Sequence, residues 1–127
     1  MKSKKSKKWK RPKKVNILGI TYKIIYNGKD GRLKGTSVAS HDRFVKEIIM
    51  EDKSYFKETE STCRNLIALE KQTLRHEIIH AFLYESGLSH NANSSNCWAL
   101  NEEMVDWIAI QFPNIYKVFK KLNIHKD

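Results

Sequence analysis

Apolar and polar positions follow a two-residue spacing in the first half of the chain. Over Val15–Tyr26 the side chains are rich in β-branched and aromatic types, which predicts a strand with a bulge at Gly19. Further strands are expected within residues 37–45 and over Lys46–Met50. The pattern therefore predicts a small antiparallel N-terminal sheet of about three strands.

The second half has the spacing of helices. A long helix is expected to begin near Thr59 or Ser61, since either side chain can cap it, and to run to about Ser86. Gly87 suits the position just after its last turn. Apolar side chains lie nearly all round the later part of this helix, so we expect it to be central and buried.

A second helix is expected over about Cys97–Gln111. Pro113 is expected to end it and to start a final helix that runs through about Leu122. The predicted fold class is therefore α+β, with the small antiparallel sheet packed on the central helix and on one or two further C-terminal helices.

The length of 127 residues fits a single domain that needs no disulfide support. The two cysteines, Cys63 and Cys97, form no Cys-x-x-Cys pair and are expected to be reduced thiols of a cytoplasmic protein. No apolar run approaches the length of about eighteen residues that a membrane span needs, so no membrane partner is expected.

Basic residues are concentrated at the N-terminus, where residues 1–14 hold nine Lys or Arg and no acid. The remaining fifteen basic and fourteen acidic residues leave residues 15–127 with a net charge of +1. We therefore expect a disordered basic tail over residues 1–14 and one domain over residues 15–127. The tail could contact nucleic acid or another acidic surface, or it could serve only to keep the protein soluble.

The long predicted helix contains the string His-Glu-Ile-Ile-His at residues 76–80. Residues four apart on a helix are rotated by only about 40° and rise about 6 Å, so His76 and His80 can both reach one metal ion. Glu77 flanks the same face. Two imidazoles and a carboxylate beside a metal-activated water are the minimum parts of a zinc peptidase. The alternative interpretation is a pair of core histidines satisfied by neighbouring side chains.

A catalytic zinc site needs three protein ligands and one open position. Glu102 is the first choice for the third ligand, because its helix face is expected to point inward, where a carboxylate is costly unless bound. Asp106, one turn later, is placed to accept a hydrogen bond from the free ring nitrogen of a ligand histidine. Glu103 and the loop residue His90 are alternative ligands. Both glutamates could instead be surface acids favoured by a helix N-terminus. Two other histidines are interpreted as incidental: His41 and His125.

Two segments carry a family resemblance: Thr-Leu-Arg-His-Glu-Ile-Ile-His-Ala-Phe at residues 73–82 and Asn-Glu-Glu-Met-Val-Asp at residues 101–106. Together they resemble the small gluzincin-type zincin metallopeptidases, and are similar to the minimal domains of phages and mobile elements that resemble the ImmA/IrrE group. The second segment also resembles the thermolysin pattern, which implies Glu102 as the third ligand and Asp106 as the support of a ligand histidine. The first is also similar to SprT-like proteases, some of which act on DNA-bound proteins and which usually take a histidine as third ligand.

The leading hypothesis is a zinc-dependent metallopeptidase that hydrolyses a peptide bond of a protein or peptide substrate, with Glu77 as the general base. Residues 15–127 would then be one zincin-like domain, with a strand edge available to an extended substrate. Tyr84 could stabilise the oxyanion, although core packing explains it equally well. The alternatives are a nucleic-acid-associated binding module that uses residues 1–14, including SprT-like action on DNA-bound proteins, and a zinc-binding pseudo-enzyme.

Overall fold

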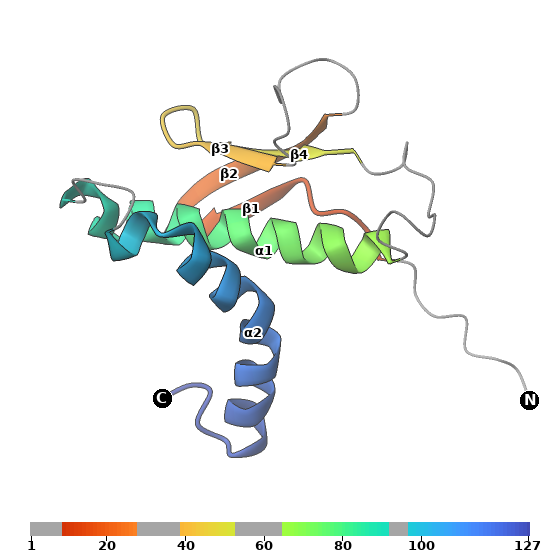
Figure 1. Ribbon diagram of the computed structural model, residues 1–127, viewed down its shortest axis with the longest axis vertical. Coiled ribbons are helices and arrows are strands. Elements are labelled where there is room, and N and C mark those ends of the chain that lie inside the picture. Colours follow the sequence, from red (N-terminus) through yellow and green to blue (C-terminus); the bar gives the residue numbers. More distant parts are fainter. Residues whose placement is uncertain (1–8, 28–38, 53–64, 92–96) are drawn as a thin grey trace, which may run out of the picture.

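An α+β fold, in which a four-stranded N-terminal sheet packs on two C-terminal helices, is seen in a computed structural model of the chain (Figure 1). The structure describes residues 9–27, 39–52, 65–91 and 97–127. This arrangement of sheet and helices confirms the predicted α+β fold class. Within these ranges neither helix has the apolar length that crossing a membrane would require.

The sheet is mixed, with strand order β1-β2-β4-β3. Its strands are β1 (Lys14–Ile17), β2 (Ile20–Asn27), β3 (Ala39–Asp42) and β4 (Glu47–Glu51). The pairs β1–β2 and β3–β4 are antiparallel, whereas β2 and β4 are parallel. The prediction of about three antiparallel strands therefore missed one strand and the parallel pairing of β2 with β4.

A tight turn, and not a bulge, divides the predicted first strand into β1 and β2. Leu18 and Gly19 form this turn with φ values of 51° and 89°. Positive φ at both central positions is the conformation of the two-residue turns that join the strands of a β-hairpin. Asn16 holds the turn, because its Oδ1 accepts a hydrogen bond of 2.8 Å from the Gly19 N–H.

Helix α1, Leu66–Glu85, begins later than predicted. Asn65 caps it, since its Oδ1 accepts a hydrogen bond of 3.0 Å from the Ala68 N–H. The predicted caps Thr59 and Ser61 lie outside the described residues. Gly87 has a φ of +86° just after the helix, as the sequence indicated, and a short 3-10 helix η2, Leu88–Asn91, follows.

Helix α2, Glu102–Lys121, is a single helix in place of the two that were predicted. A one-turn 3-10 helix η3, Trp98–Leu100, precedes it, and the Asn101 side chain caps its first turn. Pro113 lies inside α2 and does not end it. A proline leaves the carbonyl four residues earlier without its helical donor. Here that carbonyl, of Ala109, accepts a hydrogen bond of 2.6 Å from Arg75 Nε.

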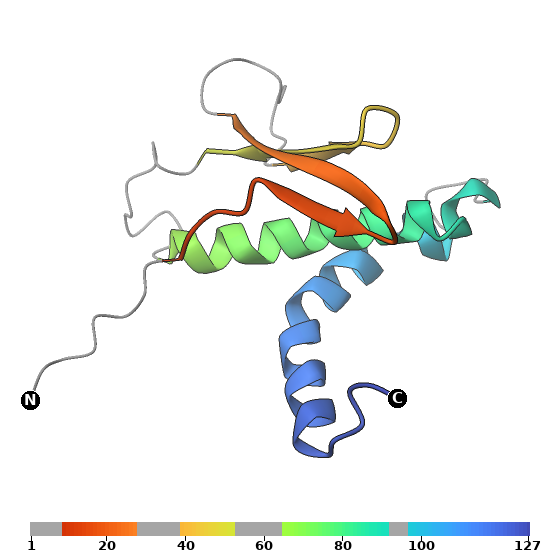
Figure 2. The ribbon, with the colours of Figure 1, turned by 180° about the vertical axis from the view of Figure 1, so that it is seen from behind.

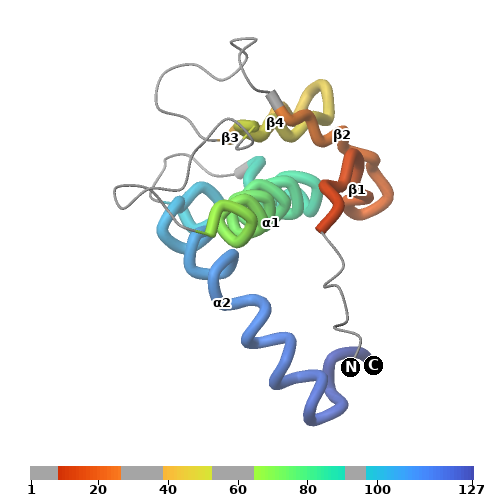
Figure 3. The backbone as a smooth tube through the Cα atoms, turned by 90° about the vertical axis from the view of Figure 1, so that its right-hand side faces the viewer, coloured from red at the N-terminus to blue at the C-terminus, as the bar shows by residue number. Residues whose placement is uncertain are grey.

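The core lies between the sheet and α1, which runs along one face of the sheet (Figure 2). Its buried side chains come from both layers: Ile17, Tyr22, Ile24, Ile48, Met50, Leu74 and Ala81. Viewed down α1, the sheet lies on one side of this helix and α2 leaves on the other (Figure 3). The prediction of reduced thiols stays a prediction, since Cys63 lies outside the described residues.

The end of the predicted basic tail belongs to the folded body. Arg11 Nε donates a hydrogen bond of 2.7 Å to Glu70 Oε1, and its Nη1 donates one of 3.0 Å to Asp52 Oδ1. Lys14 already lies in β1. The body therefore begins before residue 15, and only residues 1–8 of the expected tail lie outside the described residues.

Candidate metal centre

The two motif histidines lie one turn apart on α1, as the i, i+4 spacing predicts, and converge. Their Nε2 atoms are 3.0 Å apart. The side chain of His80 is 8% exposed and that of His76 is 15% exposed, so both rings are largely shielded from water. The helix therefore delivers two imidazole nitrogens to one point at the border of the core.

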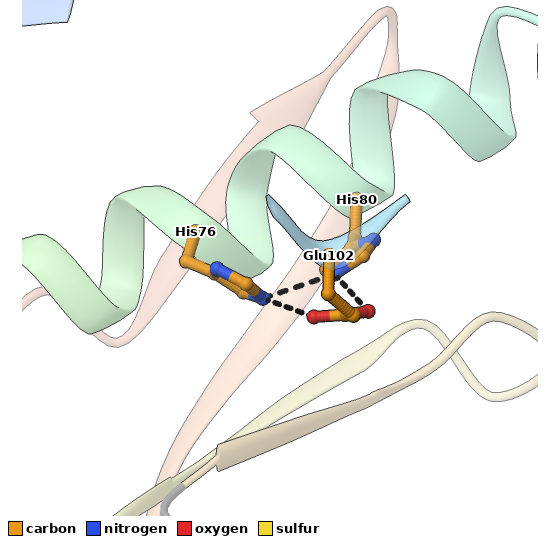
Figure 4. A group of neighbouring side chains, drawn as sticks. All are labelled: His76, His80 and Glu102. Atoms are coloured by element: carbon orange, nitrogen blue, oxygen red, sulfur yellow. Dashed lines mark hydrogen bonds and ion pairs between the residues drawn. The ribbon is translucent and has the colours of Figure 1, made fainter. Parts of the chain in front are cut away.

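Glu102, the first residue of α2, completes the group (Figure 4). Its two carboxylate oxygens lie 3.0 Å from His76 Nε2 and 3.1 Å from His80 Nε2. The cap fixes this position, because Asn101 Oδ1 accepts the Met104 N–H at 2.8 Å and so sets where α2 starts. The prediction that Glu102 lies on an inward-facing side of its helix was wrong. Its side chain is 68% exposed and reaches the histidines from the solvent side.

The donor set fits a divalent cation. Two nitrogens and a carboxylate all lie within 4.8 Å of one another, from His76, His80 and Glu102. In a tetrahedral zinc site with ligand distances of about 2.0–2.1 Å, neighbouring donor atoms are roughly 3.3 Å apart. The two Nε2 atoms, 3.0 Å apart, approach that spacing, and each lies 3.0 or 3.1 Å from a different oxygen of the Glu102 carboxylate. Several divalent ions accept such ligands.

Asp106 supports the first histidine. Its Oδ1 lies 2.6 Å from His76 Nδ1, the ring nitrogen that does not face His80. A carboxylate at Nδ1 holds the proton there, so Nε2 keeps its lone pair for a cation. The structure thus brings Asp106 to the place that the sequence suggested for it.

Burial also favours the neutral form of His80. Loss of water around the ring lowers the pKa of His80 below its usual value, while the nearby Glu102 carboxylate acts in the opposite direction. A neutral imidazole is the form that binds a metal ion.

Glu77 lies beside the group and has a partner that the sequence did not reveal. His41 Nδ1, from β3, is 2.9 Å from Glu77 Oε2. The His41 ring also stacks on His80, with ring centroids 4.9 Å apart. The interpretation of His41 as incidental was therefore wrong. The sequence alone gives no sign of this contact. The two residues meet only in the folded protein, where the pairing of β3 with β4 places His41 over α1.

Comparisons with protein-family models, with curated proteins and with solved structures gave no match.

The remaining candidates lie elsewhere. His90 packs against Tyr84, with ring centroids 4.8 Å apart, and is not part of the metal-binding group. Glu103 points to a separate surface hollow beside Trp98 and Trp107. Within the described residues, the group found is the one with Glu102 as third donor.

Proposed function

We propose that the chain is a zinc-dependent metallopeptidase, in which His76, His80 and Glu102 bind the metal. One observation carries the proposal: two helical imidazoles and a carboxylate from another helix converge beside a second, largely buried carboxylate, that of Glu77. A structural zinc site has no use for this extra acid, whereas hydrolysis needs a base there.

When bound, Zn²⁺ supplies Lewis acidity toward a carbonyl oxygen and acidifies a water molecule. Glu77 would carry out the proton transfers. Its Oε2 accepts a hydrogen bond from His41, which leaves Oε1 free to take a proton from the attacking water and to return it to the leaving amine. Because the Glu77 side chain is only 8% exposed, bulk water competes little for that position.

The edge strand β3 is the best candidate for holding the substrate. It is the last strand of the sheet order and carries His41, so its outer edge runs beside the metal-binding group. An extended peptide could add to this edge through main-chain hydrogen bonds, which are independent of side-chain identity. A protein or peptide substrate is therefore favoured over a small compact one.

Two variants test this function. Elemental analysis should find near-stoichiometric zinc in the wild-type protein and little in His80→Ala. Glu77→Gln should keep the zinc and abolish cleavage of an unfolded protein such as casein. Zinc retention by His80→Ala would refute the ligand set. Full activity of Glu77→Gln would refute the mechanism, and zinc without cleavage in the wild-type protein would indicate a pseudo-enzyme.

A second candidate function is a nucleic-acid contact through the basic N-terminus, which would bring the peptidase to DNA-bound proteins. Nine Lys or Arg within residues 1–14 favour it. Arg11 is committed to Glu70 and Asp52, so deletion of residues 1–8 is a cleaner test than deletion of the whole segment. Equal, salt-insensitive binding of DNA by the intact and shortened chains would exclude this role.

A further inference from the structure

The contacts between β3 and α1 continue beyond the candidate metal centre. His41 of β3 stacks on His80 of α1, with ring centroids 4.9 Å apart. Just past the end of β3, the guanidinium carbon of Arg43 lies 5.1 Å from the centroid of the Tyr84 ring, which belongs to α1. Figures 1 and 2 show the turn between β3 and β4 over the C-terminal part of α1. Two neighbouring contacts therefore join this part of the sheet to α1, one at the metal-binding group and one beyond it.

The second contact lies about two residues of extended peptide from the first. Tyr84 follows His80 by four residues, which is a rise of about 6 Å along nearly the same helix face. Arg43 follows His41 by two residues, which is about 6.6 Å of strand. The two steps agree in length and run in the same direction. Since an extended peptide also rises about 3.3 Å per residue, a substrate along β3 would bring a group two residues from the metal close to Arg43.

The Arg43 guanidinium is positioned by aromatic rings and a turn, and not by an acid. Its carbon atom lies 5.1 Å from the centroid of the Phe44 ring, as it does from that of Tyr84. Asp42 fixes the turn, because its Oδ1 accepts the Phe44 and Val45 N–H groups at 2.9 and 3.1 Å. Within the described residues no ion pair or hydrogen bond is found for the Arg43 side chain. Its N–H groups are therefore available to a ligand, and the stacking reduces the freedom that binding would cost.

The other cation beside Tyr84 already has an acid. Lys46 Nζ lies 5.0 Å from the centroid of the same ring and donates a hydrogen bond to Glu85 Oε1. Lys46 and Glu85 balance each other, whereas Arg43 adds a positive charge that no acid among the described residues pairs with. A guanidinium presents its N–H groups in a fork that matches the two oxygens of a carboxylate. The ligand chemistry that fits Arg43 is therefore a carboxylate.

We propose that Arg43, stacked on Tyr84, binds a carboxylate of the peptide substrate about two residues from the scissile bond. An acidic side chain or the C-terminus of a short peptide can supply this group. The inference rests on the proposed peptidase function, since that function places the peptide along β3. Arg43 is then a specificity-determining residue, and Tyr84 is the surface that holds its guanidinium in place.

Peptide binding to the Glu77→Gln protein, with zinc added, tests this site apart from hydrolysis. One series of C-terminally amidated peptides carries glutamate at successive positions of an alanine-rich chain, and a matched series carries glutamine. Fluorescence anisotropy should show about tenfold tighter binding of the best glutamate peptide than of its glutamine match. If only glutamine peptides with a free C-terminus gain as much, the site binds the chain end. Equal binding of all these peptides, or of none, would overturn the proposal.

A matched pair of substitutions separates Arg43 from general charge. Arg43→Gln and Lys23→Gln each remove one positive charge, but Lys23 alternates with the buried Tyr22 and Ile24 and so faces away from α1. Made in the Glu77→Gln protein, Arg43→Gln should abolish the preference for a carboxylate, while Lys23→Gln should change it less than about twofold. Equal losses in both would refute the role of Arg43.

The proposed function and this inference can fail separately. A wild-type protein that binds zinc and cleaves casein, but whose Glu77→Gln form shows no preference for a carboxylate, would refute the inference alone. A preference that depends on Arg43, in a protein that cleaves nothing, would support the carboxylate site and refute the peptidase function.

Discussion

The imidazole of His41 and the carboxylate of Glu77 lie 2.9 Å apart, although 36 residues separate them in the sequence. His41 Nδ1 occupies one oxygen of the carboxylate and thereby fixes the direction of the other. In the proposed mechanism this makes His41 a positioning residue, because it acts through Glu77 and not on the substrate.

Replacement of His41 tests that relationship. His41→Ala should lower kcat by about 10–100-fold, since a misplaced base loses that much, with little change in KM or zinc content. His41→Asn should restore much of the loss, because its amide nitrogen can occupy the place of Nδ1. A loss of zinc in His41→Ala, or the absence of any rescue by asparagine, would show that His41 acts otherwise.

Asp106 is predicted to set the affinity for the metal. Its carboxylate lies 2.6 Å from His76 Nδ1, and loss of such a partner costs about 10–100-fold in metal affinity. Asp106→Ala should therefore weaken zinc binding by that factor in a competition titration with a chelator. Glu103→Gln is the matched control, since it removes a nearby exposed acid of the same helix that lies outside the metal-binding group. Equal losses in both variants would indicate a general charge effect.

The features of the candidate metal centre that depend on residues close in sequence could be predicted. His76 and His80 converge because helical geometry alone fixes residues four apart. Asp106 follows Glu102 by the same rule, so once one side chain reaches the histidines the other does too. These relationships need no knowledge of the rest of the fold.

The predictions that were wrong concern features that depend on contacts between distant segments. The parallel pairing of β2 with β4 has no local signal, and it decides where β3 and His41 lie. The continuation of α2 through Pro113 depends on a donor from another helix, Arg75. Such contacts become visible only when the elements are already assembled.

Arg75 is therefore predicted to compensate for Pro113. Arg75→Ala should lower the free energy of unfolding by about 1–3 kcal/mol, because the Ala109 carbonyl loses its donor. In a Pro113→Ala background the same substitution should cost about 1 kcal/mol less, since residue 113 then supplies a backbone N–H to that carbonyl. Urea denaturation of the wild type, both single variants and the double variant measures this coupling. An identical cost of Arg75→Ala in both backgrounds would show that the two features are unrelated.

Glu85 is predicted to make stability fall in acid. Its Oε1 accepts hydrogen bonds from Lys46 Nζ and, at 2.6 Å, from Tyr22 Oη. The hydrogen bond from Lys46, followed by that from Tyr22, lowers the pKa of Glu85 below its ordinary value of 4.5. A lowered pKa means that the ionised carboxylate stabilises the folded state above pH 4.5, and that this contribution is lost as the pH falls further.

Glu85→Gln isolates this contribution, because glutamine keeps the shape of the side chain and cannot ionise. At neutral pH the variant should be less stable than the wild type by about 1–3 kcal/mol, since hydrogen bonds to a charged group are lost. As the pH falls below 4.5, protonation of Glu85 makes the wild type resemble the variant, and the difference should shrink. Denaturant unfolding of both proteins across a series of pH values measures it. Other carboxylates titrate equally in both proteins and cancel, so a difference that stays constant with pH would show that the charge of Glu85 contributes nothing.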